Sequence, residues 1–313
     1  MLFSIIVCTY GRSTAVEQLF ESLSVQTQSN FELLVVDANG PNSLIRPILE
    51  RFSNTMPVRC IPAQRGLTRQ RNVGLRESRG ELICFLDDDV TVEPEFLENV
   101  QALFARPDLQ DMGGLTGYDV VNYPTTPNLR WKLKWWLRSI PSLTPGDADH
   151  LGRAVPISFL PPSSGCRNIG WLSGFCMIYR RVAVTGLEFD EKLPTYGGED
   201  RDFSTRVAQK WRLVLCGDLR LKHHCTTQGR VDDIERVYQT GYGTGRRFAK
   251  HARTLLDYVV VVRSLIGDFI VDVLYFVARP SKTTFLGTFA RLHGFFQGLN
   301  SFTSDVQRRE VQA

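Results

Sequence analysis

The first hundred residues alternate between continuous apolar runs and segments in which apolar residues recur every three or four positions. Each continuous run is typical of a strand that is buried on both faces. The predicted strands cover residues 2–8, 31–36, 58–61 and 82–86, and the predicted helices between them cover 13–23, 44–52 and 68–78. Strands that alternate with helices at this interval predict a mostly parallel central sheet with helices on both faces.

The rest of the chain predicts an irregular middle and a helical C-terminal extension. Residues 119–170 are rich in Pro, Ser, Thr and Gly, and we expect them to form a partly ordered region that faces the substrate. Further helices are predicted over 93–104, 199–211, 231–252, 255–278 and 283–300, and further strands over 171–181 and 212–216. The glycines at 241–245 favour a loose turn rather than a phosphate loop, because no strand precedes them.

These patterns divide the chain into three parts. We expect a catalytic domain over residues 1–228, a helical region over 229–305 that contacts a membrane surface or a second copy, and a frayed tail over 306–313.

Composition and charge narrow the class of protein. Of the 313 residues, 43% are hydrophobic and 22% are charged, which is the balance of a globular protein. The net charge of +4 is too small for a protein that coats nucleic acid, so no nucleic-acid partner is expected. The chain has no run of about 18 uncharged apolar residues and no basic leader before its first apolar run. Its seven scattered cysteines are odd in number, so we expect a reducing, cytoplasmic location.

Acidic residues follow two of the predicted buried strands. Asp37 comes after the second strand, and Asp87, Asp88 and Asp89 come after the fourth. Ligands bind at this edge of such sheets. Consecutive carboxylates repel one another unless solvent or a cation neutralises them, and Mg²⁺ or Mn²⁺ prefers oxygen ligands. The alternative is a solvated acidic turn in which Asp89 helps to cap the next helix.

A second acidic pair stands where another helix is expected to begin. Glu199 and Asp200 follow the turn made by Gly197 and Gly198. Carboxylates at such a position can perform acid–base chemistry. The alternative is that Asp200 only caps the helix.

Five segments, in their order along the chain, resemble the motifs of glycosyltransferase family 2. They are Ile6 to Tyr10, Val35 to Asp37, Arg71 to Gly74, Phe85 to Asp89, and Gly198 to Asp200. The resemblance covers roughly residues 1 to 225. It implies the GT-A fold and metal-dependent transfer of one sugar from a nucleotide-sugar, most often a UDP-sugar, with inversion at the anomeric carbon. The acceptor would be a glycan or a lipid-linked molecule in cell-surface polysaccharide or glycoconjugate synthesis.

The resemblance assigns nucleotide contacts to single residues. Thr9 and Tyr10 correspond to a turn that touches the nucleotide, and Asp37 corresponds to the acid that reads the base. Arg71 is placed near the nucleotide, with Arg65 as the alternative.

The same resemblance makes Asp87 and Asp89 the outer acids of a D-x-D motif that binds Mg²⁺ or Mn²⁺. Asp89 is then the direct ligand, and Asp88 lies closer to the ribose. His223 resembles a further contact to the metal or the diphosphate, although the adjacent His224 leaves this assignment open.

The remaining assignments concern catalysis and the sugar. Asp200 corresponds to the catalytic base, with Glu199 beside it. Trp171, Ser173 and Gly174 lie where the family places residues near the donor sugar and the acceptor. An ordinary buried strand is the alternative for this last segment.

Two segments suggest contact with a membrane. Residues 128–140 contain four basic residues, three tryptophans and no acid, which suits either a bilayer interface or a helix packed on its own domain. Residues 255–278 predict a helix with a narrow polar stripe and a broad apolar surface, which favours helix packing or a homodimer. We expect peripheral association with the inner face of the plasma membrane.

Two other functions fit parts of the pattern. A nucleotidyltransferase that makes sugar nucleotides would need a Gly-rich phosphate loop after the first strand, where residues 8–12 hold a single glycine. A non-catalytic binding protein with the same fold would not need acids at both sites, so the presence of both groups of acids disfavours this alternative. A processive synthase is disfavoured because the chain has no Q-x-x-R-W motif.

Overall fold

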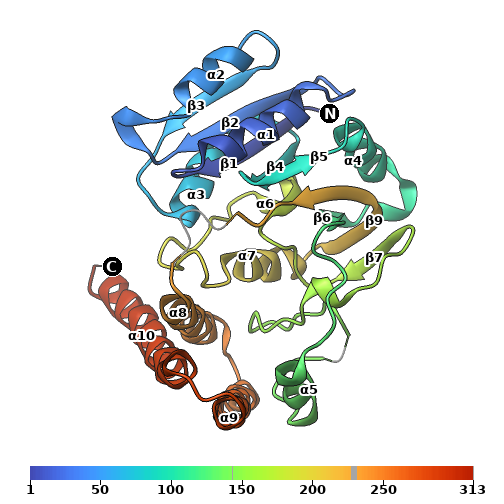
Figure 1. The fold of residues 1–313 in the computed structure, drawn as a ribbon. Coiled ribbons are helices and arrows are strands. Elements are labelled where there is room, and N and C mark those ends of the chain that lie inside the picture. The colour runs from blue at the N-terminus through green and yellow to red at the C-terminus, as the bar shows by residue number, and fades with distance from the viewer. Residues whose placement is uncertain (143, 227–230, 313) are drawn as a thin grey trace.

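The computed structural model describes residues 1–142, 144–226 and 231–312 (Figure 1). The strands are β1 (Phe3–Thr9), β2 (Phe31–Asp37), β3 (Val58–Pro62), β4 (Leu82–Asp87), β5 (Val90–Val92), β6 (Met112–Asp119), β7 (Cys166–Ile169), β8 (Cys176–Arg180) and β9 (Arg212–His223). The α-helices are α1 (Ser13–Ser24), α2 (Arg46–Phe52), α3 (Leu67–Glu77), α4 (Phe96–Ala105), α5 (Leu129–Trp136), α6 (Arg181–Val184), α7 (Glu199–Ala208), α8 (Asp233–His251), α9 (Leu255–Ala278) and α10 (Lys282–Gln312).

The four strands predicted from the first apolar runs form one half of the central sheet. β3, β2, β1 and β4 lie side by side in that order, and neighbouring strands are parallel. Their side chains fill two cores, one against α1 and α4 and the other against α7 on the opposite face. This arrangement confirms the predicted α/β class and brings the carboxyl ends of β1, β2 and β4 to one edge.

The other half of the sheet is mixed, so the sheet is less parallel than the sequence predicts. β8 runs antiparallel to both β4 and β6, whereas β6 and β9 are parallel. β5 and β7 each pair antiparallel with a different part of β9. The predicted strand over 212–216 is only the first part of β9, which continues to His223 and reaches the edge where β4 ends.

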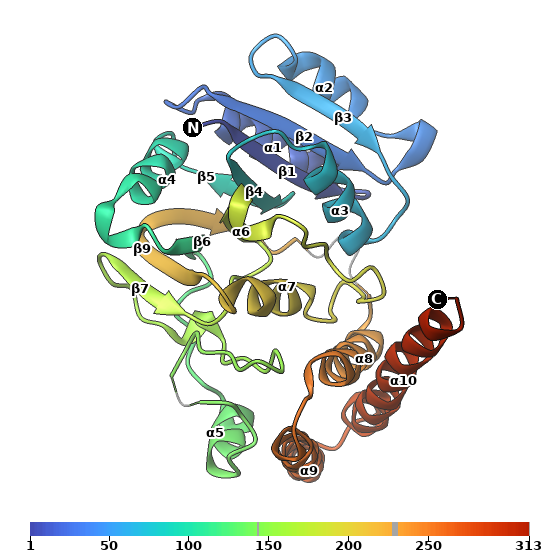
Figure 2. The same ribbon diagram turned by 180° about the vertical axis from the view of Figure 1, so that it is seen from behind.

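Three helices, α8, α9 and α10, form the C-terminal region on the side of the molecule away from β1 to β3 (Figures 1 and 2). The sequence predicted all three of them. α10 continues to Gln312, through most of the segment expected as a frayed tail, and Ala313 lies outside the described residues.

Glycines allow α8 and α10 to pack backbone against backbone. A Cβ atom at Gly245 of α8 would lie 1.9 Å from the carbonyl oxygen of Phe295, and one at Gly298 of α10 would lie 1.9 Å from that of Tyr242. Neither position can therefore carry a larger residue without moving the helices apart.

Another glycine of α8 faces the loop before α7. A Cβ atom at Gly243 would lie 1.9 Å from the carbonyl oxygen of Gly197, which precedes α7. The loose turn expected at residues 241–245 is wrong, because these residues lie inside α8. The glycines serve close packing there and do not break the helix.

The polar stripe of α9 faces the protein, and its apolar surface faces outward. Asp257 lies 2.8 Å from His150, and Ser264 donates to the Ser139 carbonyl at 3.0 Å. Eleven large apolar residues of α9 are exposed: Leu255, Leu256, Tyr258, Val259, Val262, Ile266, Phe269, Ile270, Val273, Leu274 and Val277. No helix within the described ranges is both long and apolar enough to cross a membrane.

Helix α5 packs against α9 through ion pairs. Arg130 pairs with Asp272, and Lys134 pairs with Asp268 at 2.8 Å. The predicted amphipathic helix is therefore held to the C-terminal helices of the same chain by two of its basic residues. Trp136 remains exposed at its end.

A buried carboxylate joins α7 to α8. Asp202, on α7, is fully buried. Its oxygens lie 2.8 Å from His251 Nε2, 2.9 Å from Lys250 Nζ and 2.9 Å from Arg206 Nη2. Burial alone would raise the pKa of Asp202, but these three partners lower it overall. The carboxylate therefore stabilises the contact between α7 and α8.

Asp202→Asn is expected to lower the free energy of unfolding by about 3–5 kcal/mol, because it leaves buried cations without their counter-charge. Since the folded-state pKa of Asp202 is depressed, the stabilisation is complete above the unfolded pKa of about 3.9 and is lost as the pH falls below it. Urea unfolding of both proteins between neutral and acid pH measures this. Asp108→Asn, at an exposed surface pair, is the control; equal stability of the two variants would contradict the prediction.

Candidate active site

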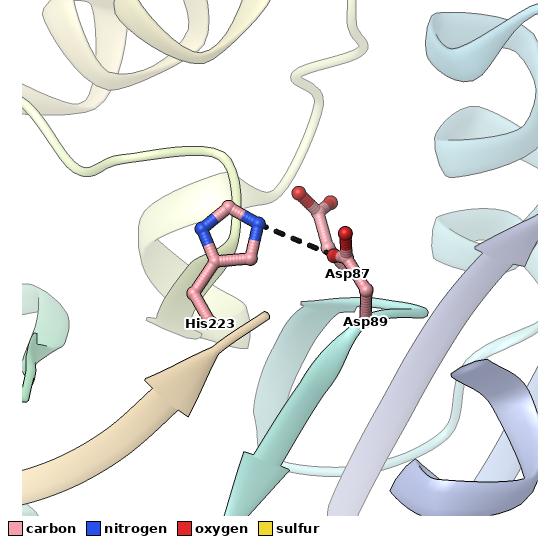
Figure 3. A group of neighbouring side chains, drawn as sticks. All are labelled: Asp87, Asp89 and His223. Atoms are coloured by element: carbon pink, nitrogen blue, oxygen red, sulfur yellow. Dashed lines mark ion pairs between the residues drawn. The ribbon is translucent and has the colours of Figure 1, made fainter. Parts of the chain in front are cut away.

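The acids after β4 and the histidine that ends β9 meet at one edge of the sheet (Figure 3). β4 ends at Asp87, and the turn through Asp89 leads into β5. β5 pairs with β9 so that Val90 lies opposite His223. One ligand atom from each of Asp87, Asp89 and His223 lies within 4.8 Å of the others. We call these three residues the acidic cluster.

Only one of the two adjacent histidines faces the acids. His223 Nε2 lies 3.2 Å from Asp89 Oδ1, and the His223 ring stacks on Phe175 with the ring centroids 5.0 Å apart. His224 Nε2 instead lies 2.9 Å from Thr91 Oγ1. Neighbouring side chains at a strand end point to opposite faces, which explains the difference.

The acidic cluster has the character of a metal site. Asp89 Oδ1 is buried and forms no well-aligned hydrogen bond with the described residues; its contact is the ion pair with His223 Nε2 at 3.2 Å. Burial raises the pKa of Asp87. Burial would also raise the pKa of Asp89, but His223 and the Thr226 amide lower it overall, so Asp89 stays ionised. Two carboxylates with an unsatisfied oxygen fit Mg²⁺ or Mn²⁺.

The middle acid of the turn faces the end of β1. Thr9 Oγ1 donates to Asp88 Oδ2 at 2.8 Å, and Arg12 Nη1 donates to Asp88 Oδ1 at 3.0 Å. Arg12 Nη1 also lies 3.7 Å from Asp89 Oδ2. Burial raises the pKa of Asp88 to about 6, although Arg12 opposes this rise. Asp88 therefore belongs to the β1 end and not to the acidic cluster.

The predicted nucleotide residues line the ends of β1 and β2. Asp37 is buried and accepts the backbone N–H of Asn39 at 2.8 Å. Asn39 in turn accepts the backbone N–H of Gly11 at 2.6 Å, which ties the two strand ends together. Tyr10 is 42% exposed, and the Arg65 guanidinium lies 4.3 Å from its ring centroid. Tyr10 and Arg65 offer a flat, charged surface on which a nucleobase can stack.

Arg71 links the acidic cluster to the second acidic pair. Its Nη2 lies 3.3 Å from Asp87 Oδ1 and donates to the Gly174 carbonyl at 2.9 Å. Its Nη1 lies 3.0 Å from Glu199 Oε1. Arg71 is buried, and these protein groups surround its guanidinium. Its direct contact with a nucleotide stays a prediction.

Glu199 and Asp200 begin α7 after Gly198, whose φ of +75° favours glycine. Asp200 Oδ2 accepts the Gly174 amide at 3.1 Å, and Asp200 Oδ1 accepts the Arg201 amide at 2.8 Å. Burial, followed by repulsion from Asp200, raises the pKa of Glu199 to about 7. The two carboxylates therefore have different surroundings: Glu199 is paired with Arg71, and Asp200 is held by backbone amides.

A cavity of about 550 Å³ adjoins this pair, and both Glu199 and Asp200 line it. Trp171 lines the same cavity, with its Nε1 donating to the Val155 carbonyl at 3.1 Å. Ser173 closes the turn that presents Gly174, because its carbonyl accepts the Cys176 amide at 3.1 Å. Of the three residues predicted to lie near the donor sugar and the acceptor, Trp171 is the one that lines the cavity among the described residues, and acceptor binding there stays a prediction.

Sequence reasoning missed two residues that contact the acids. Arg12 pairs with Asp88, and both the amide and the hydroxyl of Thr226 donate to Asp89 Oδ2, at 2.9 and 3.1 Å. The position of Thr226 just beyond His223 was the available signal. Nothing in the local pattern distinguished Arg12 from other turn residues.

Solved structures share this architecture. The chain matches Staphylococcus aureus TarS, residues 1–349, in complex with UDP-GlcNAc, with a TM-score of 0.62 and 19% identity over 96% of this chain and 82% of that chain. It also matches the mannosyltransferase PcManGT of Pyrobaculum calidifontis in complex with GDP-Man and Mn²⁺, with a TM-score of 0.54 and 15% identity over 96% and 84% of the two chains. The fold is therefore that of the GT-A glycosyltransferases.

The family follows from the sequence match. The model of glycosyl transferase family 2 covers residues 4–186, more than half of the chain, and the protein belongs to this family. An uncharacterised glycosyltransferase of Haemophilus influenzae is 40% identical over 111 residues, which are 34% of this chain and 36% of that protein. TarS, a poly(ribitol-phosphate) β-N-acetylglucosaminyltransferase, is 30% identical over 107 residues, 33% of this chain and 18% of that protein. The matched segments thus span little more than a third of these relatives at most.

Proposed function

We propose that this protein is a metal-dependent inverting glycosyltransferase that moves one sugar from a nucleotide-sugar, with a UDP-sugar favoured, to a hydroxyl of a glycan or lipid-linked acceptor. The observation that carries the proposal is that Arg71 joins the acidic cluster to the second acidic pair. Its guanidinium lies 3.3 Å from Asp87 Oδ1 and 3.0 Å from Glu199 Oε1. Sugar transfer requires a site for the diphosphate beside a base.

In this proposal the edge of β1 and β2 binds the nucleotide. Asp37 reads the base, Tyr10 and Arg65 stack on it, and Asp88 with Thr9 lies toward the ribose. The fixed contacts of Asp37 with Asn39 and of Asp88 with Thr9 hold these groups in place before the donor binds. The preference for uracil belongs to the proposal.

The acidic cluster holds Mg²⁺ or Mn²⁺ in the proposed mechanism. The bound cation would neutralise the charge that develops on the leaving diphosphate. Asp87 and Asp89 would supply carboxylate oxygens, and His223 would supply an imidazole nitrogen. Arg71 keeps Asp87 in position through their 3.3 Å contact.

Asp200 acts as the catalytic base. It accepts the proton of the acceptor hydroxyl while that oxygen forms a bond to the anomeric carbon and the bond from this carbon to the diphosphate breaks. The backbone amides of Gly174 and Arg201 orient the carboxylate. Attack opposite the leaving group inverts the configuration at the anomeric carbon.

A screen of UDP-, GDP- and dTDP-sugars tests the function without a known acceptor. We expect hydrolysis of a UDP-sugar that requires Mn²⁺ or Mg²⁺ and stops on addition of EDTA. Pyrophosphate formation from a sugar phosphate and a nucleoside triphosphate would instead identify a nucleotidyltransferase. A protein that binds none of these nucleotides in thermal-shift assays would be a non-catalytic member of the family.

The proposal includes peripheral association with an anionic membrane through the outward surface of α9. Its exposed apolar residues form one continuous helical face, which includes Val259, Val262 and Ile266. The acids of α9 point inward to protein partners, whereas Arg263 and Arg279 are exposed. An apolar helix face with exposed cations suits a bilayer that contains anionic lipid.

Flotation with vesicles of phosphatidylglycerol and phosphatidylcholine measures this association. Burying an aliphatic side chain contributes about 1.5–3 kcal/mol, so the double variant Val262→Ser/Ile266→Ser is expected to bind at least about tenfold less. Val25→Ser, at another exposed valine, is the control. Equal flotation of the unmodified protein, the double variant and the control would contradict the membrane contact. A protein that forms a dimer in solution and does not bind vesicles would contradict it as well.

A further inference from the structure

The cavity beside Asp200 extends from the second acidic pair to the C-terminal helices. Glu199 and Asp200 lie on one wall, and Trp131, Leu265 and Phe295 lie on walls made by α5, α9 and α10. A molecule in this cavity would meet Asp200 at one place and apolar side chains at another. The inference concerns the acceptor in the proposed function and rests on that function.

Several cations around this cavity are neutralised by carboxylates. The clearest pairs are Lys134 with Asp268 at 2.8 Å, Arg153 with Asp149 at 2.6 Å, and Arg236 with Asp233 at 2.8 Å. These cations need no ligand to balance their charge.

Two further arginines of the cavity differ from these. Arg201, on α7, and Arg247, on α8, converge over Gly198: a Cβ atom at Gly198 would lie 2.5 Å from both Arg201 Nη2 and Arg247 Nη1. Neither guanidinium forms an ion pair with a carboxylate of the described residues. The nearby Asp202 is already bound by Arg206, Lys250 and His251.

Arg247 is the more telling residue, because it is only 2% exposed. Its Nη1 donates to the Gly197 carbonyl, and its Nη2 lies 3.4 Å from Thr244 Oγ1. Its Nε has no hydrogen-bond partner among the described residues. Burial and then the charge of Arg201 lower the pKa of Arg247 to about 9.

A buried cation without an ion-pair partner is costly, and a second cation beside it adds repulsion. The charges of Asp202, Asp200 and Glu199 offset only part of this cost for Arg247, because burial and Arg201 lower its pKa overall. An anion between the two guanidinium groups removes both penalties. Phosphate suits this place because its oxygens accept parallel N–H groups from the planar guanidinium fork. The two arginines meet over Gly198, and Gly198 is followed directly in the chain by Glu199 and Asp200.

We propose that Arg201 and Arg247 bind a phosphate group of the acceptor and so place the acceptor hydroxyl beside Asp200. The phosphate can belong to a lipid phosphate, whose chain would lie along the apolar wall, or to a water-soluble polyol-phosphate chain. The two sources share the anion that the arginines recognise.

Isothermal titration of the full chain with octyl phosphate tests this site. EDTA in the buffer excludes any contribution from a metal at the acidic cluster. Arg201→Gln and Arg247→Gln are each expected to weaken binding by about tenfold to a hundredfold, because each removes a charge-assisted hydrogen bond. Arg236→Gln, which removes a cavity cation that already has a carboxylate partner, is expected to bind like the unmodified protein.

The Arg201 variant keeps the test decisive if Arg247→Gln fails to fold, because no described residue depends on the Arg201 guanidinium for a hydrogen bond. Thermal unfolding identifies such a failure. Unchanged octyl phosphate binding by Arg201→Gln would overturn the proposal, as would equally tight binding of octanoate. Glycerol 3-phosphate distinguishes the sources: much weaker binding than octyl phosphate supports a lipid phosphate, and similar binding supports a soluble phosphate chain.

Titration with UDP and Mn²⁺ separates this inference from the proposed function. Both arginine variants are expected to bind UDP normally. If the unmodified protein binds octyl phosphate through the arginines but binds no nucleotide, the anion site stands and the glycosyltransferase proposal fails. If the unmodified protein binds UDP but both arginine variants bind octyl phosphate as tightly as it does, only the acceptor inference fails.

Discussion

Asp200→Asn is expected to lower the rate of sugar transfer by about 10²–10⁴-fold, the usual contribution of general-base catalysis. The amide side chain has almost the same shape, so it can still accept one of the two backbone N–H groups that orient Asp200. It cannot take the proton of an acceptor hydroxyl. Nucleotide binding is expected to persist, because Asp200 is not part of the acidic cluster.

Release of UDP in the presence of acceptor measures the transfer rate, and titration with UDP and Mn²⁺ measures binding. Asp108→Asn, at an exposed ion pair, controls for a general effect of losing one carboxylate. Near-normal turnover by Asp200→Asn would show that another group is the base. Glu199, with its pKa raised to about 7, would then be the next residue to change.

Asp89→Asn is expected to abolish most of the metal-dependent part of UDP binding. Removing a group that merely supports a metal ligand already costs about 10- to 100-fold in affinity, and Asp89 would be a ligand itself. Asp89 Oδ1 has no well-aligned hydrogen bond from the described residues and faces His223 Nε2 at 3.2 Å. Titration with UDP in Mn²⁺ and in EDTA separates the metal-dependent part from the rest.

Asp218→Asn serves as the control for this variant, because Asp218 accepts the Gly165 amide far from the acidic cluster in the described structure. If Asp89→Asn kept full Mn²⁺-dependent affinity, the acids would be a solvated turn, the alternative that the sequence left open. If UDP bound equally in Mn²⁺ and EDTA to every protein, nucleotide recognition would not involve a metal.

The first half of the fold was predictable because its strands are long, apolar and buried on both faces. β1, β2 and β4 correspond to the first, second and fourth apolar runs, and the acids that end β2 and β4 lie at the edge of the sheet where ligands commonly bind. The class of fold and the position of Asp37 and Asp87 therefore followed from local patterns.

The second half of the sheet was not predictable, because its amino-acid composition is unlike that of typical strands. β6 contains three glycines in eight residues, which is the opposite of a strand signal, yet it is buried throughout. One cause is close packing: a Cβ atom at Gly117 would lie 2.4 Å from the Leu219 carbonyl oxygen. Such tertiary crowding leaves no trace in periodicity.

The sequence indicated which residues belong to the candidate site better than it indicated their contacts. Sequence motifs named Asp89 and His223, but only the pairing of β5 with β9 decided between His223 and His224. The approach of Arg247 to Arg201 depends on how α8 meets α7. No local pattern encodes that distance, so this pair became visible only in three dimensions.

The contact of Gly243 with the Gly197 carbonyl has a practical consequence for protein engineering. Gly197 lies two residues before Glu199, so α8 supports the backbone that carries Glu199 and the proposed base Asp200. A minimal version that stops after β9 would leave this loop without its support and the cavity without three of its walls. Chimeras that exchange specificity between relatives should therefore transplant α8 together with the loop before α7.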